Sequence, residues 1–240
     1  MDEKEAAAKP DVKPEAKPGS KPAVKKDSER VENMVALGVF AFLILIAVFI
    51  FTQGFGLMKN SSPTDRVNVQ LGNDPVRGNA SDPIIIIAFS DYECPFCRKA
   101  EMTIRDIEQQ YAGQVVLIFK DFPLTQIHKD ALNAALAAEC AREQGKYWEY
   151  HDYLFDHNDK LDIGSLELYA LQFNMSAEKF NSCLESQKFK YEIDSDIKAA
   201  TAAGVSSTPT FFINGIAVVG AQPEEEFTKI INSELSSSPR

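Results

Sequence analysis

Cysteine and histidine, the usual ligands of zinc, are scarce: the 240 residues include four cysteines and three histidines. A single Cys-x-x-Cys is present, at Cys94 and Cys97, so the second pair that a zinc-finger site needs is missing. None of His128, His151 and His157 stands at metal-ligand spacing from a cysteine. We therefore expect no metal site and no cofactor.

An excess of positive charge is also lacking. Lys and Arg number 25 against 35 Asp and Glu, which gives a formal charge of −10. Residues 1–33 hold eight basic and eight acidic side chains and are neutral, so the whole excess lies in the remainder. A chain with this charge does not suit nucleic acid as a partner.

The N-terminal residues contain two contrasting segments. Residues 1–33 are rich in Lys, Pro and Ala and poor in large apolar side chains, which predicts a disordered tail, because too little surface can be buried to offset the entropy of ordering. Residues 34–58 contain no charged side chain, and at about 1.5 Å per helical residue they are long enough to cross a hydrocarbon core of about 30 Å. We predict a single transmembrane anchor there.

A cleaved signal peptide is the alternative interpretation of this apolar segment. The region before it is long, the apolar run exceeds a usual signal-peptide core, and no small-x-small cleavage site follows it. Basic side chains are frequent in residues 17–30, whereas only Lys59 and Arg66 follow the segment closely. The positive-inside rule then places the tail in the cytoplasm and the C-terminal domain outside the cell membrane.

A linker is predicted at 59–65 and a folded domain at 66–236, with a short tail after it. Residues 67–71 alternate apolar and polar side chains, which predicts a first strand. The segment 72–83 is rich in Gly, Asn, Asp and Pro and predicts a loop.

The centre of the domain is an apolar strand, Ile84 to Phe89, that leads into the Cys-x-x-Cys and a helical pattern from Arg98 to Tyr111. At the start of a helix, unpaired N–H groups and the positive end of the dipole stabilise a thiolate. Cys94 is therefore predicted to be the acidic, attacking thiol, and Cys97, one turn later, the resolving thiol. Pro95 suits the first helical position.

A second apolar strand, Val115 to Phe119, completes a strand–helix–strand unit and implies a parallel pair. About eighty residues of helical pattern then predict an insertion at about 126–204, whose aromatic residues at helical spacing we interpret as core. The asparagine and glycine at 214 and 215 are a hairpin signal. The remaining elements expected are helices at 128–144, 146–157, 165–173, 177–186, 189–203 and 223–235 and strands at 210–213 and 216–220.

Four segments together carry a family resemblance. They are FSDYECPFC at 89–97, FKDFPL at 119–124, QGKYWEYH at 144–151 and GVSSTPTFFING at 204–215. In this order they make the domain resemble the DsbA family of thiol-disulfide oxidoreductases, in particular its membrane-anchored, DsbA-like group. The resemblance implies an α/β thioredoxin-like fold with an inserted helical subdomain.

The resemblance also implies roles for residues near the cysteine pair. Pro209 is expected to follow a cis peptide bond opposite the Cys-x-x-Cys, which leaves the Thr208 backbone free to pair with an extended substrate segment beside Cys94. Pro95 and Phe96, between the cysteines, are assigned to substrate binding together with Thr208.

The chain departs from its relatives beneath the cysteines. Ala88 stands where they carry an acidic residue, six positions before the nucleophilic cysteine, so a proton relay through that place is absent. Glu101 and Lys120 match a glutamate and a lysine that accompany this acid, and they are candidate modulators of the Cys97 proton; a structural ion pair is the alternative. Phe96 replaces a histidine and so removes a cation that would stabilise the thiolate.

Cys140 and Cys183 fall in two different helical segments. An oxidising compartment favours a structural disulfide between them, and some relatives have a second bridge; two buried thiols are the alternative. Asn60, Asn79 and Asn174 begin glycosylation sequons, to which we assign no role.

The sequence thus leads to the hypothesis of a membrane-tethered, extracytoplasmic dithiol oxidase that introduces disulfides into exported proteins. The resemblance implies reoxidation by a membrane partner of the DsbB or VKOR type. The same residues can act in the opposite direction, as a reductase or isomerase. A non-catalytic thioredoxin-like binding module is a further alternative, against which the presence of both cysteines and Pro209 argues.

Overall fold

The computed structural model describes residues 66–79, 81 and 83–237. The anchor predicted at 34–58, with the tail and linker on either side of it, lies outside these residues. In the part of the chain that is described, no helix is both long and apolar enough to cross a membrane.

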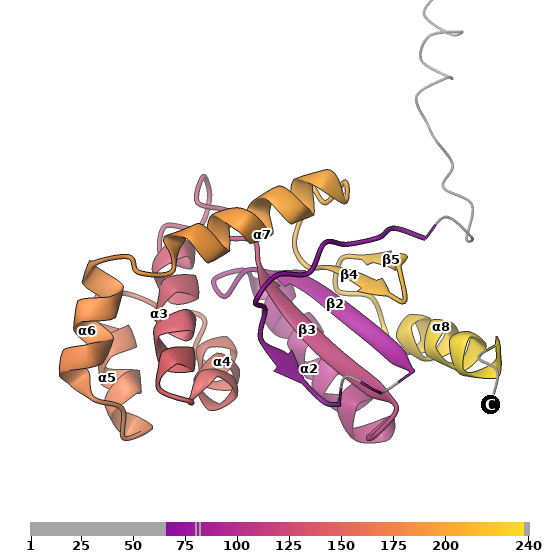
Figure 1. Ribbon diagram of the computed structural model, residues 1–240, viewed down its shortest axis with the longest axis horizontal. Helices are drawn as coiled ribbons and strands as arrows, with labels where there is room; N and C mark the ends of the chain where they lie inside the picture. The colour runs from indigo at the N-terminus through magenta and orange to yellow at the C-terminus, as the bar shows by residue number, and fades with distance from the viewer. Residues whose placement is uncertain (1–65, 80, 82, 238–240) are drawn as a thin grey trace, which may run out of the picture. The chain divides into compact units, whose positions relative to one another are not determined.

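The described residues form a mixed sheet of five strands in the order β1-β3-β2-β4-β5, with β2 and β3 as its long central members (Figure 1). β2 (Ile84–Ser90) and β3 (Val115–Asp121) are parallel, as the strand–helix–strand pattern predicts, and the other neighbouring pairs are antiparallel. Apart from Ile85, the side chains of both strands are buried, because helices cover both faces of the sheet. The predicted thioredoxin-like α/β fold is confirmed.

The predicted first strand is wrong. Val67, Val69 and Leu71 form no strand; Val69 packs into a core cluster, and the Val67 N–H donates to the carbonyl oxygen of Gly215 at 2.8 Å. The edge position belongs instead to β1 (Val76–Arg77), which pairs with β3 inside the segment predicted as a loop. The alternation at 67–71 therefore reflects burial of a side chain and not a hydrogen-bonded ladder.

The predicted hairpin is confirmed. β4 (Thr210–Ile213) and β5 (Ile216–Val219) pair antiparallel across Asn214 and Gly215. These two residues have φ angles of 46° and 86°, and two consecutive positive φ angles are what a type I′ turn requires. Because β4 also pairs antiparallel with β2, the segment that enters β4 lies at the carboxyl end of β2, where the Cys-x-x-Cys begins.

Two apolar clusters occupy the two faces of the sheet. Ile86 and Ala88 belong to one, with residues of α2 (Pro95–Gln110) and α8 (Glu224–Ser237), whereas Ile87 and Phe89 belong to the other. This division follows from the alternation of side chains along a strand. The first cluster supports α2 and the second lies beneath α7.

The helical insertion is confirmed between β3 and β4. Figure 1 shows α3, α4, α5 and α6 gathered beside the sheet, while α7 passes across it and packs on β3. The inserted helices are α3 (Ala131–Glu143), α4 (Tyr147–Asp156), α5 (Ile163–Gln172), α6 (Ala177–Glu185) and α7 (Lys190–Ala202).

Cys140 on α3 and Cys183 on α6 form a disulfide with an S–S distance of 2.00 Å. Of the two interpretations of these residues, the structural bridge is therefore the one present. The bond joins helices whose bonded cysteines stand 43 positions apart in the sequence. It lies in the insertion and leaves the Cys-x-x-Cys pair as two free thiols.

Candidate active site

Cys94 lies at the boundary between the loop after β2 and the first turn of α2. It is the N-cap residue, with extended backbone, and Pro95 follows within the first turn, as predicted. The Arg98 N–H donates to the Cys94 carbonyl at 3.1 Å and closes the first helical turn. The N–H groups that have no partner inside the helix therefore surround the Cys94 side chain. Phe96 projects from this turn with 64% of its surface exposed.

The two thiols differ in acidity. A hydrogen bond from the Cys97 thiol, together with bonds from the backbone N–H groups of Cys97 and Phe96, outweighs burial and lowers the pKa of Cys94 to about 6. Burial raises the pKa of Cys97 well above its usual value, and its position beside the Cys94 thiolate adds to this rise. At neutral pH one thiolate is therefore expected, on Cys94, as the helix-terminus argument predicts.

Thr208 lies directly beside the reactive sulfur. The Thr208–Pro209 peptide bond is cis, and the Thr208 carbonyl accepts a hydrogen bond from Cys94 Sγ at 3.8 Å. The fold thus brings Thr208 and Pro209, which the resemblance assigns to the site, to the same place as Cys94. Since Thr210 pairs with Phe89 in the ladder, the segment before Thr210 runs alongside the loop that leads to Cys94.

Ala88 is buried and pairs in the sheet with Phe119 and Phe211. An apolar side chain therefore occupies the position at which the DsbA-like resemblance implies an acidic residue. Ser90, two residues further along the same face of β2, hydrogen-bonds the Cys97 side chain and lowers its pKa against the effect of burial. The polar contact to Cys97 from this strand therefore comes from Ser90.

The candidate modulators Glu101 and Lys120 are held in ion pairs. Lys120 Nζ lies 2.7 Å from Asp74 and 2.8 Å from Asp196, and only 2% of its side chain is exposed. Glu101 is paired with Arg77 and with other groups on α2 and α4. The contacts of both residues match the structural ion-pair alternative.

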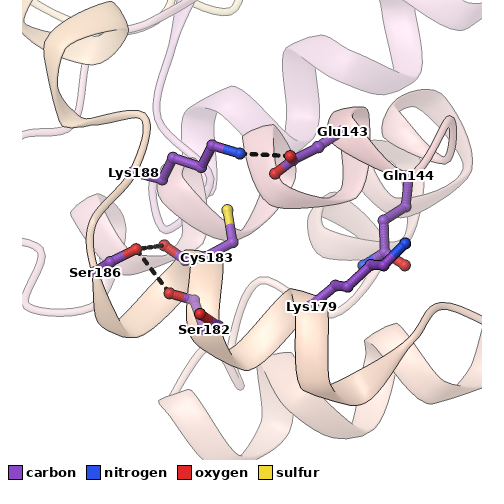
Figure 2. Close-up of a pocket in the computed structure, with 7 residues that line it drawn as sticks. All are labelled: Glu143, Gln144, Lys179, Ser182, Cys183, Ser186 and Lys188. Atoms are coloured by element: carbon purple, nitrogen blue, oxygen red, sulfur yellow. Dashed lines mark hydrogen bonds and ion pairs between the residues drawn. The ribbon is translucent and has the colours of Figure 1, made fainter.

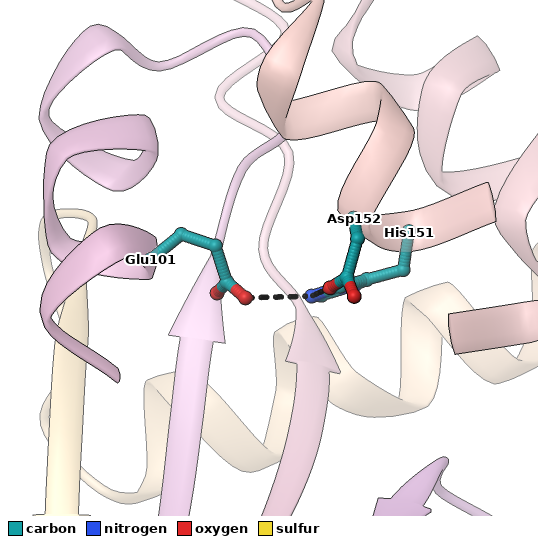
Figure 3. Close-up of side chains that lie close together, drawn as sticks. All are labelled: Glu101, His151 and Asp152. Atoms are coloured by element: carbon teal, nitrogen blue, oxygen red, sulfur yellow. Dashed lines mark ion pairs between the residues drawn. The ribbon is translucent and has the colours of Figure 1, made fainter. Parts of the chain in front are cut away.

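Glu101, His151 and Asp152 form a cluster whose ligand atoms lie within 4.8 Å of one another, and Figure 3 shows their side chains converging from α2 and α4. Two guanidinium groups already bind these carboxylates. Arg77 lies 3.4 Å from Glu101 and 2.9 Å from Asp152, and Arg105 lies 3.5 Å and 3.6 Å from the same two residues. A metal ion would have to displace or face both cations, so the cluster does not fit a metal site.

Asp91 is a site residue that the sequence analysis missed. It is buried, and its carboxylate accepts hydrogen bonds from the backbone N–H groups of Glu93 and Leu124 and from His128 Nδ1, each at 2.8 Å. The carboxylate joins the loop before Cys94 to the loop after β3. An acidic residue three positions before the Cys-x-x-Cys was the available signal, but two of its three partners, Leu124 and His128, lie more than thirty residues away.

Asp121 is a second missed residue. It ends β3 in register with Ser90, is buried, and its Oδ1 finds no hydrogen-bond partner among the described residues. Burial, and then the charges of Glu139 and Asp196, raise its pKa well above the usual value. Asp121 and these two acidic residues line a cavity of about 180 Å³.

A more open cavity of about 580 Å³ lies beside the structural disulfide (Figure 2). Lys188 pairs with Glu143 across it, and Ser186 donates to the backbone of α6. Neither redox cysteine belongs to its lining, so this cavity does not serve the thiol chemistry. The lining residues are Glu143, Gln144, Lys179, Ser182, Cys183, Ser186 and Lys188.

Comparison with known proteins identifies the family to which this domain is similar. The sequence model of the family described as Thioredoxin matches residues 70–233. The Na(+)/H(+) antiporter NhaA 3 of Salinispora tropica is 36% identical over 172 residues, which cover 72% of this chain and 26% of that protein. The chain spans about a quarter to a third of the length of the first curated relatives it matches. The ion transport in the names of these relatives therefore refers to proteins that are much longer than this chain.

Two solved structures share the fold. The crystal structure of Wolbachia pipientis alpha-DsbA1 has a TM-score of 0.62 and 25% sequence identity and covers 70% of this chain and 94% of that one. Oxidised BdbD from Bacillus subtilis has a TM-score of 0.64 and 23% identity and covers 72% and 100%, respectively. The DsbA-like resemblance inferred from the four sequence segments is thereby confirmed.

Proposed function

Since the chain belongs to the thioredoxin family and has a DsbA-like fold, we propose that it is a protein thiol-disulfide oxidoreductase that acts through Cys94 and Cys97. The observation that carries the proposal is the opposite perturbation of the two thiols: the pKa of Cys94 is lowered to about 6 and that of Cys97 is raised. Two cysteines with a purely structural role are not expected to differ in this way, with one stable as a thiolate and the other protonated.

In the oxidase direction, a substrate thiolate attacks Cys94 Sγ of the Cys94–Cys97 disulfide. The S–S bond breaks, Cys97 leaves with the electron pair and takes up a proton, and a mixed disulfide forms. A second substrate thiolate then attacks the substrate sulfur of that bond, and Cys94 leaves as a thiolate. The substrate gains one disulfide, and the protein gains two electrons and is left with a Cys94 thiolate and a Cys97 thiol.

The acidity of Cys94 favours this direction because it stabilises the reduced protein and makes Cys94 a good leaving group. The pKa of Cys94 is lowered in the same direction as the pKa of the attacking cysteines of thioredoxin and DsbA. Return to the disulfide form requires an electron acceptor, for which we propose a membrane partner of the DsbB or VKOR type.

The proposed location is the outer side of the cell membrane, with the N-terminus in the cytoplasm. The uncharged segment at 34–58 and the basic residues before it support this location. The Cys140–Cys183 disulfide also supports it, because structural disulfides persist in oxidising compartments. The proposed substrates are exported proteins with cysteine pairs.

The experiment that tests the proposal compares two activities of the full chain: oxidation of a reduced, unfolded protein and reduction of insulin. An oxidase performs the first with a stoichiometric oxidant, a reductase the second, and a binding module neither. Titration against glutathione adds the potential: a value near −120 mV favours the oxidase and one near −270 mV the reductase. Activity that survived in Cys94→Ser would rule out the proposed mechanism.

A further inference from the structure

We propose that His128, held by the buried carboxylate of Asp91, supplies a fixed positive charge beside Cys94 and stabilises its thiolate. This inference deepens the proposed function, because it names a residue that tunes the reactive thiol. His128 acts through the electrostatic field and through Asp91, so it is a positioning residue and not an attacking group.

Asp91 forms hydrogen bonds to both His128 and Cys94. Its carboxylate accepts a hydrogen bond from His128 Nδ1 at 2.8 Å, and its backbone carbonyl accepts one from the Cys94 N–H at 3.1 Å. None of the Asp91 side chain is exposed, so these bonds form in a region that water does not reach. The imidazole and the start of α2 are therefore attached to the same buried residue.

The backbone of His128 is fixed as well. Its N–H donates to the Leu124 carbonyl at 2.9 Å, and the Leu124 N–H donates to the Asp91 carboxylate at 2.8 Å. The turn that carries the imidazole is thus tied to the active-site loop at two points. With 16% of its side chain exposed, His128 can still exchange its proton with solvent.

The charges around the imidazole favour its protonated form. Burial opposes protonation, but Asp91, the Cys94 thiolate and Glu93 outweigh it and raise the pKa of His128. The interaction of two charges is mutual, so the cation that Cys94 stabilises must in turn stabilise the Cys94 thiolate. The neighbouring Lys129 is turned outward, with 83% of its side chain exposed.

His128 adds to the hydrogen bonds at Cys94 and does not replace them. Bonds from the Cys97 thiol and from the Cys97 and Phe96 backbone are the main groups that lower the Cys94 pKa. The residues between the two cysteines, Pro95 and Phe96, bring no charge. The Arg98 guanidinium, which follows Cys97 in the chain, donates to Asn158 Oδ1 at 3.4 Å, whereas His128 is tied to the loop before Cys94 through Asp91.

The test uses His128→Gln, which removes the charge but keeps an N–H donor for Asp91. Lys129→Gln is the matched control, because it removes one positive charge from the adjacent, exposed position. Thiolate absorbance at 240 nm is followed against pH in the reduced full chain, and the dithiol is titrated against glutathione. Neither readout needs a protein substrate, so the inference can fail while the proposed function stands, and the reverse.

The expected result is a higher pKa of Cys94 in His128→Gln and a glutathione equilibrium shifted about threefold towards the oxidised protein. Lys129→Gln should titrate like the parent. His128→Lys restores a positive charge without the imidazole and should recover most of the difference between the parent and His128→Gln. If His128→Gln folds poorly, the comparison of His128→Lys with the parent takes its place. An unchanged titration in His128→Gln, an equal shift in Lys129→Gln, or a failure of His128→Lys to recover would each overturn the inference.

Discussion

The carbonyl oxygen of Thr208 accepts a hydrogen bond from Cys94 Sγ at 3.8 Å, although 114 positions separate the two residues in the sequence. The contact arises because β4 runs antiparallel to β2 and brings residues 208 and 209 to the carboxyl end of β2. An extended substrate segment that pairs with this backbone would have its sulfur next to Cys94. The predictions below follow from this site and the groups that surround it.

The two cysteines should behave differently when replaced. Cys94→Ser should lose thiol-disulfide exchange completely, since it removes the attacking sulfur. Cys97→Ser should keep the thiolate at Cys94 but lose the resolving thiol, so mixed disulfides should accumulate. Non-reducing gels of the variants incubated with a reduced client and oxidant measure both effects. Equal trapping by the two variants would contradict the assigned roles.

The reactivity of the reduced protein should follow the acidity of Cys94. Because burial keeps Cys97 protonated, the rate of alkylation by iodoacetamide should rise with pH, reach half its plateau near pH 6, and involve one cysteine. Rates measured between pH 4 and pH 9, with peptide mapping of the label, provide the check. A midpoint near pH 8.5, the value of an ordinary thiol, would remove the main support for the proposal.

Lys120 should contribute to stability and not to redox chemistry. Lys120→Met leaves Asp74 and Asp196 without their buried cation, which should lower the free energy of unfolding by about 3 to 5 kcal/mol. Urea denaturation measures this loss, and the exposed Lys129→Met serves as the control, expected within about 0.5 kcal/mol of the parent. A changed Cys97 titration in Lys120→Met would instead revive the modulator hypothesis.

Asp121 should make stability depend on pH. Its folded-state pKa lies well above the aspartate value of 3.8, so the folded state holds a proton that the unfolded chain has released. This contribution is complete below about pH 4 and is lost as the pH rises through the folded pKa. The parent should therefore lose stability as the pH rises above about 4.

Asp121→Asn should lose less stability than the parent over this range. Part of the decline should remain, because the pKa of Glu139 is raised to about 7, mainly by burial, and Glu139 has the same sign of effect. Urea midpoints at several pH values give the comparison, and the exposed Asp106→Asn is the control. Parallel curves for Asp121→Asn and the parent would show that the acid is ionised in the folded protein.

Local sequence patterns were enough to predict most elements of the fold. The apolar run before Cys94, the helical periodicity between 126 and 204 and the Asn214-Gly215 turn each specify structure over a few neighbouring residues. The pattern at Val67 to Leu71 misled because burial of Val69 imitates the alternation of a strand, while the two-residue β1 is too short to leave a pattern.

The electrostatic groups of the site were harder to predict. Asp91, His128 and Asp121 depend on contacts between segments that lie far apart in the sequence, and no spacing rule connects them. Lys120 was identified by its place in a motif, but the partners that fix its role, Asp74 and Asp196, lie on either side of it at distances of 46 and 76 residues. Such pairings become visible only when the chain is folded.

The disulfide between Cys140 and Cys183 has a consequence for how the protein matures. A newly made chain with four reduced cysteines has three ways to pair them, and only one joins Cys140 to Cys183 and Cys94 to Cys97. If the chain oxidises other proteins, it is also a client of that chemistry, because its own insertion must be oxidised before the domain is complete. Protein produced in a reducing cytosol should therefore be an immature form that contains Cys94 and Cys97 but lacks the Cys140–Cys183 disulfide.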